Sequence, residues 1–491
     1  MRLALGRLRD RPVLLALAAI ILVGGALRLW LMVRWRPAFT GYPDSGIYLL
    51  DARGGPFYDP LRIGGYGLYL RWFHDLIRDD LSSPILAQHL MGMGSGVLLF
   101  GAVRRLAVPA WLALIPAAAI LLGGAEIFVE HAVLSEGVYI LGLCGGLYAL
   151  VRAAAGGTSP RAAAAWAALG SLALALSTTV RLAGIFVLGV AAIHLLAYGG
   201  ATWRARVAST AAAAVVAAVV LIGFQAYHEA KTGRWGFTRA GVYNLYGRVA
   251  PWADCSKFTP PAGTRQLCDD RPVEERPAHD AYLFADSPLV RAYGPPTAVP
   301  PEGAAAQISS FSRAAILGQP GAYVSAVGRE LLRVVDPSVT SRPGGRRDGE
   351  GLGPDEFATK LLDPYNDVNI IPITASHFST RGVLREDIGA LQAYERATRP
   401  PPLLMALLIA LAAVAPFSVP RAVRRGSVLL SLTALVMLTT PVVTNVYDWR
   451  YVIPALGPLA AAAALGGWAV GAAARRRLQR GGGLAERIGR R

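Results

Sequence analysis

Apolar runs long enough to cross a bilayer recur along this chain, and they constrain its fold more than any other feature of the sequence. A transmembrane helix needs about 20 mainly apolar residues to span a hydrocarbon core of about 30 Å. Charged residues make up 16% of the chain, whereas soluble proteins carry about 25%. The runs lie near residues 12–34, 83–103, 106–124, 132–151, 162–179, 182–198, 206–225, 401–418, 426–444 and 451–473. The sequence therefore predicts an all-α polytopic membrane protein with about ten transmembrane helices.

Arginines follow alternate runs and indicate how the chain is oriented. Cytoplasmic loops of membrane proteins carry an excess of Lys and Arg. With ten spans, the arginine-rich short segments all fall on one side of the membrane. They contain Arg2, Arg7, Arg9, Arg11, Arg104, Arg105, Arg152, Arg161, Arg204, Arg206, Arg421, Arg424 and Arg425. We therefore predict a multi-pass protein of the plasma (inner) membrane with both termini in the cytoplasm, the first span being retained after synthesis.

The predicted spans divide the chain into four parts. Residues 1–225 hold seven helices and a first outer loop at 35–82, and residues 401–473 hold three more helices. Between them, residues 226–400 are too polar to span, and runs of Pro and Gly interrupt them. This segment is therefore predicted to be an extracytoplasmic domain of mixed helix and irregular structure. Residues 474–491 form a basic cytoplasmic tail.

Two features of the outer domain predict local structure. Residues 304–335 have helical apolar spacing that is broken at Gln319-Pro320-Gly321, which favours two helices lying along the membrane surface. Cys255 and Cys268 lie outside the cytoplasm, where thiols tend to be oxidised, and their spacing suits a small disulfide loop. Cys144 lies inside a span and is interpreted as a packing residue.

The formal net charge of +17 does not indicate a nucleic-acid partner. The arginines are divided among short segments between apolar runs and the C-terminal region, as the positive-inside rule expects, and they form no continuous basic domain. The expected partners are membrane lipids, and nucleic acid is excluded.

Four ionisable residues near the outer ends of spans are candidates for a functional site. Asp44 lies in the Tyr-Pro-Asp-Ser-Gly turn of the first outer loop, and Glu136 lies about one turn inside the fourth span. Arg181 and Arg450 lie at the outer mouths of two other spans, against the positive-inside tendency, and a guanidinium fork matches phosphate oxygens. An acid can accept a proton from an attacking hydroxyl while arginines hold a leaving phosphate.

Plainer explanations of the charged residues stay open at this point. Arg181 could extend to the membrane interface without binding anything. Asp51 is interpreted as a solvated loop acid, and Glu126 and Glu130 as a solvated helix start, where negative charge complements the helix dipole. The sequence shows no Ser-His-Asp order, and seven scattered histidines do not suggest a zinc site.

Short motifs of the chain resemble those of the polyprenyl-phosphate-sugar-dependent glycosyltransferases of the integral-membrane GT-C superfamily. "YPDSGIY" resembles the acidic motif of their first outer loop, with Asp44 at the acid position. "LSEGVYIL" resembles the acidic segment of a later span and matches Glu136, and "RYVIPALGPL" resembles the start of a late span and matches Arg450 and Tyr451. "GRVAPWADC", at 247–255, resembles the outer-loop sequence of uncharacterised actinobacterial members.

This resemblance implies an enzyme that moves a sugar from a polyprenyl-phosphate-linked donor to an acceptor hydroxyl on the extracytoplasmic face. The acceptor would be a lipid or polysaccharide of the cell envelope or cell wall. The implied roles are general base for Asp44, donor-phosphate binding for Arg181 and Arg450, and supporting acid for Glu136. Candidates to line the sugar are Tyr48, Tyr66 and Tyr451, although packing or an aromatic belt would also explain these tyrosines.

Two alternatives concern the cofactor and the class of protein. The family often has two adjacent acids in its first loop, whereas this chain has Ser45 at the second position, so no cofactor is assigned and a divalent metal stays open. A transporter or flippase of lipid-linked saccharides is the rival function, and a non-enzymatic assembly protein is a third. Transporters are expected to show midplane charges and inverted repeats, and the charges here lie at the outer mouths instead.

Overall fold

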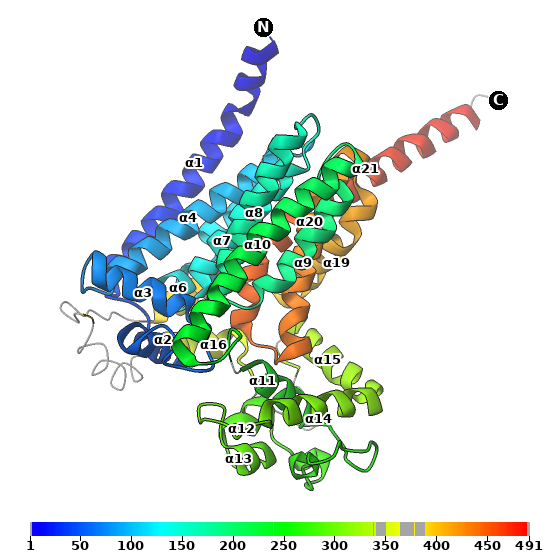
Figure 1. Cartoon of the computed structure of the whole chain (residues 1–491). Helices are drawn as coiled ribbons and strands as arrows, with labels where there is room; N and C mark the ends of the chain where they lie inside the picture. Colours follow the sequence, from blue (N-terminus) through cyan, green and yellow to red (C-terminus); the bar gives the residue numbers. More distant parts are fainter. Residues whose placement is uncertain are drawn as a thin grey trace.

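The computed structural model describes residues 2–238, 240–336, 338–339, 350–363, 378 and 388–488. Within these residues the secondary structure is helical, with no extended strand, and Phe39 and Ala132 form an isolated parallel bridge. Figure 1 shows a bundle of long helices with a group of short helices at one end. The chain is thus an all-α polytopic membrane protein, as its apolar runs predict.

Seven described helices are long and apolar enough to cross a membrane. They are α1 (Arg2–Arg34), α4 (Ser82–Arg104), α7 (Glu136–Ala153), α8 (Pro160–Val180), α10 (Trp203–Thr232), α20 (Arg421–Thr444) and α21 (Trp449–Ile488). The basic segment expected as a separate tail continues α21 as far as Ile488.

Two bent helix pairs bring the number of candidate spans to nine among the described residues. The first joins η1 (Ala110–Ala113) and α5 (Leu114–Leu122) to α6 (Gly124–His131) at 45°, and the second joins α18 (Gly389–Thr398) to α19 (Pro402–Ser418) at 41°. The remaining apolar helix, α9 (Gly184–Tyr198), has 15 residues. All ten predicted runs therefore overlap helices, but breaks and short elements make about ten an approximate number of spans.

Helix α21 forms the centre of the bundle. In its most apolar window 83% of the residues are buried, compared with 11% in α1 and in α10, which lie at the periphery. It packs against α5, α19 and α20. The small residues of "LGPLAAAAALGG" permit this close approach, because a Cβ added at Gly457 would lie 2.7 Å from Ile120 Cδ1.

The short helices occupy the end of the bundle opposite the two termini (Figure 1). Two of them, α2 (Pro43–Gly54) and α3 (Gly65–Leu76), belong to the segment between α1 and α4. The others are α11 (Ala240–Val249), η2 (Arg265–Leu267), η3 (Val273–Glu275), α12 (His279–Phe284), α13 (Pro288–Tyr293), α14 (Ala304–Gly318), α15 (Pro320–Val335) and α16 (Pro354–Leu361). The break that the sequence predicts at Gln319 separates α14 from α15.

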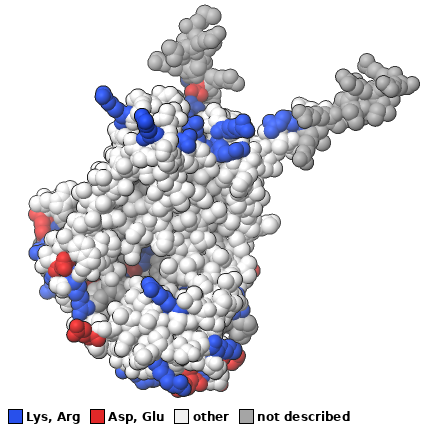
Figure 2. Space-filling view, turned by 45° about the vertical axis from the view of Figure 1, so that its right-hand side comes forward, with Lys and Arg blue, Asp and Glu red and all other residues white. Residues whose placement is uncertain are grey.

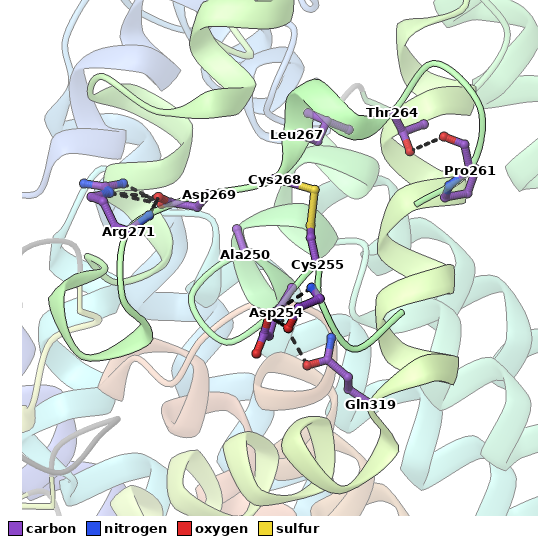
Figure 3. Close-up of a disulfide and its surroundings, with 12 residues drawn as sticks. Ala250, Asp254, Cys255, Pro261, Thr264, Leu267, Cys268, Asp269, Arg271 and Gln319 are labelled. Atoms are coloured by element: carbon purple, nitrogen blue, oxygen red, sulfur yellow. Dashed lines mark hydrogen bonds and ion pairs between the residues drawn. A yellow bond between two sulfur atoms is a disulfide. The ribbon is translucent and has the colours of Figure 1, made fainter. Parts of the chain in front are cut away.

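A disulfide joins Cys255 to Cys268 in the segment between α11 and α12 (Figure 3). It lies beside a hydrophobic core built from α11 to α14, whose buried members include Tyr246, Tyr282 and Phe311. Cys144 is a free, buried thiol in α7.

Charge is distributed unevenly over the surface. Figure 2 shows Lys and Arg side chains at the end of the bundle where the termini project, a broad uncharged belt below them, and mixed charges at the opposite end. An uncharged belt between two charged ends is the surface expected of a protein embedded in a bilayer.

Candidate active site

Asp44 lies in the first turn of α2, which begins at Pro43. Its Oδ1 accepts a hydrogen bond from Arg62 Nη2, and its Oδ2 accepts one from Arg450 Nη1. The side chain is 16% exposed. Asp44 therefore lies between two guanidinium groups, one from its own loop and one from the start of α21.

Arg450 connects this acid to a second one. Its Nε donates to Glu136 Oε1, and its Nη2 donates to Glu136 Oε2 at 3.3 Å. The Asp448 carboxylate fixes the start of α21 by accepting from the backbone N–H of Arg450 at 2.9 Å. One arginine thus bridges two carboxylates that lie 92 positions apart along the chain.

Arg181 completes this group from the C-terminal end of α8. Its Nη1 donates to Glu136 and to Ser135 Oγ, the latter at 3.1 Å, and its guanidinium lies 5.6 Å from the centre of the Tyr451 ring. We call the connected side chains of Asp44, Arg62, Glu136, Arg181 and Arg450 the arginine cluster.

The arginine cluster contains three guanidinium groups and two carboxylates, so one positive charge is unbalanced within it. Asp59 offsets part of this charge, since its Oδ1 lies 3.9 Å from Arg62 Nη1. Burial raises the pKa of the Asp44 carboxyl, but the charges of Arg62 and Arg450 outweigh burial and bring this pKa well below its usual range. Asp44 is therefore a carboxylate at neutral pH, and the cluster can attract an anion.

The loop that carries Arg62 is held by Asp51, which the sequence interpretation placed wrongly in solvent. Asp51 is fully buried, and its Oδ1 accepts from the backbone N–H of Asp59 at 2.7 Å. Asp59 Oδ1 in turn accepts from the backbone N–H groups of Leu61 at 2.7 Å and Arg62 at 3.0 Å. Because the other Asp51 oxygen is buried without a partner, burial raises the pKa of this carboxyl to about 8.

The three candidate tyrosines lie in different surroundings. Tyr48 shares a hydrogen bond of 3.2 Å with Ser135 Oγ, which also accepts from Arg181, and its ring meets the Tyr66 ring edge-on at 4.7 Å. The Tyr66 hydroxyl points instead to Gln88 Oε1, at 2.6 Å, in the bundle interior. Tyr451 lies beside Arg181, so Tyr48 and Tyr451 border the cluster. Tyr66 packs against Tyr48 on the side facing the bundle interior.

A second buried group of charges lies deeper in the bundle, and the sequence interpretation missed it. Arg28 forms two hydrogen bonds of 2.7 Å with the Glu130 carboxylate. His89 Nδ1 lies 3.1 Å from Glu130 Oε2, and His89 Nε2 lies 2.9 Å from His131 Nδ1. We call Arg28, His89, Glu130 and His131 the histidine cluster.

The structure of α6 shows that the interpretation of Glu126 and Glu130 as solvated is wrong. Every residue of Gly124–His131 is buried, and Glu126 and Glu130 are each 1% exposed. The segment between the predicted spans 106–124 and 132–151 is instead the second half of a bent helix, and it packs against α4 and α7. A charge within an apolar span usually has a buried partner. The presence of Arg28, His89 and His131 in or beside the apolar runs was the sequence signal for such partners.

The residues of the arginine cluster do not fit a divalent metal. Both carboxylates are bonded to the same cationic Arg450, whereas Mg²⁺ and similar ions need several oxygen ligands converging on one point. Among the described ranges, no three His, Cys, Asp or Glu side chains are grouped so that they could hold a metal ion.

A cavity lies between α15, α16, α18 and α19. Its volume is about 600 Å³, within the range of about 300–1,000 Å³ typical of small-molecule sites. Its wall includes Trp449, the neighbour of Arg450, and the first turn of α16. Farther along the same helix, Phe357 contacts Tyr42, whose ring lies 5.0 Å from the Arg450 guanidinium. The remaining lining mixes arginines, carboxylates, prolines and aliphatic side chains.

Comparisons with known proteins were made by sequence and by structure. No protein-family model matches the sequence, and no curated protein matches it. Among solved structures, ArnT from Cupriavidus metallidurans bound to undecaprenyl phosphate is 15% identical over 95% of this chain and 79% of that chain, with a TM-score of 0.38. The oligosaccharyltransferase of Archaeoglobus fulgidus is 11% identical over 92% of this chain and 50% of that chain, with a TM-score of 0.42. The chain therefore spans half the length of the second protein, and at this level of similarity the function has to be inferred from the site residues themselves.

Proposed function

We propose that this chain is a membrane glycosyltransferase that moves a sugar from a polyprenyl-phosphate donor to an acceptor hydroxyl. The observation that carries the proposal is the arginine cluster, in which one carboxylate, Asp44, lies directly against arginines contributed by the first loop and the last span. A phosphate-binding group and a proton acceptor are the two parts that this reaction requires.

The reaction consists of one displacement at the anomeric carbon. The acceptor oxygen forms the new bond to this carbon, the bond to the phosphate oxygen breaks, and the electron pair leaves with the polyprenyl phosphate. Asp44 takes the proton of the acceptor hydroxyl. Arg62, Arg181 and Arg450 bind the departing phosphate, because guanidinium forks pair with its oxygens.

Donor binding would also prepare Asp44 to act as a base. A carboxylate with a strongly lowered pKa accepts a proton poorly, and in this structure Arg62 and Arg450 both bond to Asp44. A donor phosphate competes for the same guanidinium groups. When it draws them away, the pKa of Asp44 rises toward its ordinary value while the substrate is in place.

The acceptor side of the reaction is proposed from the cavity behind Trp449. A saccharide or lipid headgroup suits a lining of carboxylates, guanidinium groups and apolar surface, and the cavity is large enough for one sugar unit with its linkage. The alternation of arginines in the short loops supports an outward-facing site with both termini in the cytoplasm.

The test uses the purified full chain in liposomes, with a polyprenyl-phosphate sugar and a mixture of envelope lipids and saccharides as acceptors. We expect polyprenyl phosphate to be released in step with incorporation of sugar into acceptor. Asp44→Asn should abolish most of this release, whereas Asp75→Asn, at an exposed acid on α3, should not. Movement of the intact donor across the bilayer without release would support the flippase instead.

A further inference from the structure

A second cationic site lies away from the arginine cluster, where α11 meets α15. Arg248, in the last turn of α11, is 7% exposed and lines a small cavity together with Trp252, His279, Arg329, Glu330 and Val446. Guanidinium groups stay charged in proteins, so this cation cannot be neutralised by losing a proton.

The Arg248 guanidinium is poorly satisfied by the protein. Its Nε and Nη2 are buried and have no hydrogen-bond partner, and its Nη1 lies 3.9 Å from Glu330 Oε1, beyond hydrogen-bond distance. Glu330 is already engaged, because its Oε2 accepts from the backbone N–H of Tyr447 at 3.0 Å and from Arg333 at 3.4 Å. A buried charge with unmet donors costs free energy unless another group pairs with it.

A second arginine adds to the unmet hydrogen-bond donors at this cavity. Arg329 Nε is also buried without a partner at the same cavity, so two guanidinium groups there have unmet donors. His279 does not supply an acceptor, since its Nδ1 lies 2.7 Å from Asp280 and its Nε2 lies 3.1 Å from the carbonyl of Asn244. The cavity wall therefore carries two cations and one acid, Glu330.

The size of the cavity restricts the ligand. Its volume is about 40 Å³ on a measure for which one water needs about 10–15 Å³. That is room for a group of about three water-sized atoms, such as the oxygens of one phosphate, and not for a sugar ring. A metal cation is disfavoured by the two guanidinium groups.

We propose that Arg248 and Arg329 form a binding site for the oxyanion of a phosphate group. Filling this site would join α11 and α15 to the segment containing Val446, which leads through Asp448 to Arg450. The phosphate could come from solution or from a lipid headgroup, which present the same oxygens. This proposal needs no assumption about sugar transfer.

The experiment measures thermal unfolding of the full chain in detergent against phosphate concentration, with chloride at matched ionic strength as the control. Ligands that bind the native state raise the midpoint. Because the arginine cluster can also bind phosphate, the series is run in the Arg62→Gln background. We expect phosphate to raise the midpoint there, and addition of Arg248→Gln to weaken apparent phosphate affinity about 10- to 100-fold, the usual effect of losing hydrogen bonds to a charged group.

Arg248→Gln should fold, since it removes a buried cation with two unpaired donors, and Arg329→Gln provides a second variant at the same cavity. Short-chain phosphatidic acid replaces inorganic phosphate in a parallel series. A stronger shift with phosphatidic acid assigns the site to a lipid headgroup, and a stronger shift with inorganic phosphate assigns it to a soluble phosphate. An equal response with and without both arginines, or no response to either probe, would overturn the proposal.

Discussion

The arginine cluster and the histidine cluster are both buried groups of charges, but they differ in balance and in access. In the histidine cluster one arginine faces one glutamate, and both side chains are at most 4% exposed. In the arginine cluster three arginines face two acids, and Arg62, Asp44 and Arg181 keep side-chain exposures of 21%, 16% and 13%. The first group is closed and balanced, while the second is partly open and has one more arginine than its own two acids, with Asp59 at 3.9 Å from Arg62.

This difference separates a structural role from a binding role. Buried ion pairs are costly to assemble and more costly to break, so a balanced and closed pair such as Arg28–Glu130 fixes how α1, α5 and α6 meet. A partly exposed group of three guanidinium groups offers binding energy to an anion instead. Variants in the two clusters should therefore separate stability from turnover.

The largest effect on donor binding is expected from Arg450→Lys. Lysine keeps the positive charge and much of the fold, but it cannot bond Asp44 and Glu136 and present a fork to phosphate at once. We expect undecaprenyl phosphate affinity, measured by scintillation proximity or by thermal shift, to fall about 10- to 100-fold. Unchanged affinity would remove Arg450 from the donor site.

The largest effect on stability is expected from Glu130→Gln. The change leaves the Arg28 cation buried without its counter-ion, and breaking such a pair typically costs about 3–5 kcal/mol. We expect a clearly lower unfolding midpoint, while the turnover per folded molecule stays within about threefold of wild type. Loss of turnover at an unchanged midpoint would assign the histidine cluster to catalysis and erase the distinction drawn above.

A smaller effect on binding is expected from Arg181→Ala, because two other arginines remain at the site. Loss of one charge-assisted contact should weaken undecaprenyl phosphate binding about tenfold. Arg161→Ala is the matched control, since Arg161 is exposed at the other end of the same helix. Equal responses of the two variants would mean that net charge, and not position, governs binding.

The smallest effect on turnover is expected from Asp51→Asn. Asparagine keeps the oxygen that accepts from Asp59, so the loop bearing Arg62 should stay in place and turnover should remain near normal.

The variant should instead change the dependence of stability on pH. Wild-type Asp51 has a folded pKa of about 8 and an ordinary value of 3.8, so the folded state binds more protons between these values and the free energy of unfolding falls as pH rises. Asp51→Asn should flatten this decline in midpoints measured from pH 5 to 9, and an unchanged slope would show that Asp51 does not titrate this way.

Much of the fold and part of the site were predictable from the sequence. Apolar length located the long helices of the bundle, because burial in lipid leaves a strong compositional signal. Asp44, Glu136, Arg181 and Arg450 stood out because each charge breaks an apolar context at the same side of the membrane. The structure brings these four side chains into one connected group.

The rest depended on tertiary packing that periodicity cannot reveal. Arg62 is one of several arginines in its loop, and only the bonds from Asp51 through Asp59 place it beside Asp44. The bend between α5 and α6 buries a segment that lies between two predicted spans, and this burial makes the solvated interpretation of Glu126 and Glu130 wrong.

The most direct measurement of the central proposal is turnover of Asp44→Asn, scored as polyprenyl phosphate released from a lipid-linked sugar by correctly folded protein. The variant keeps the size of the side chain and removes the proton acceptor, and general-base assistance is typically worth about 10²–10⁴-fold. We predict a fall in turnover of that order, with undecaprenyl phosphate binding retained or tightened because Asp44 no longer competes for Arg62 and Arg450. Near-normal turnover of Asp44→Asn would contradict the proposal that this carboxylate is the base.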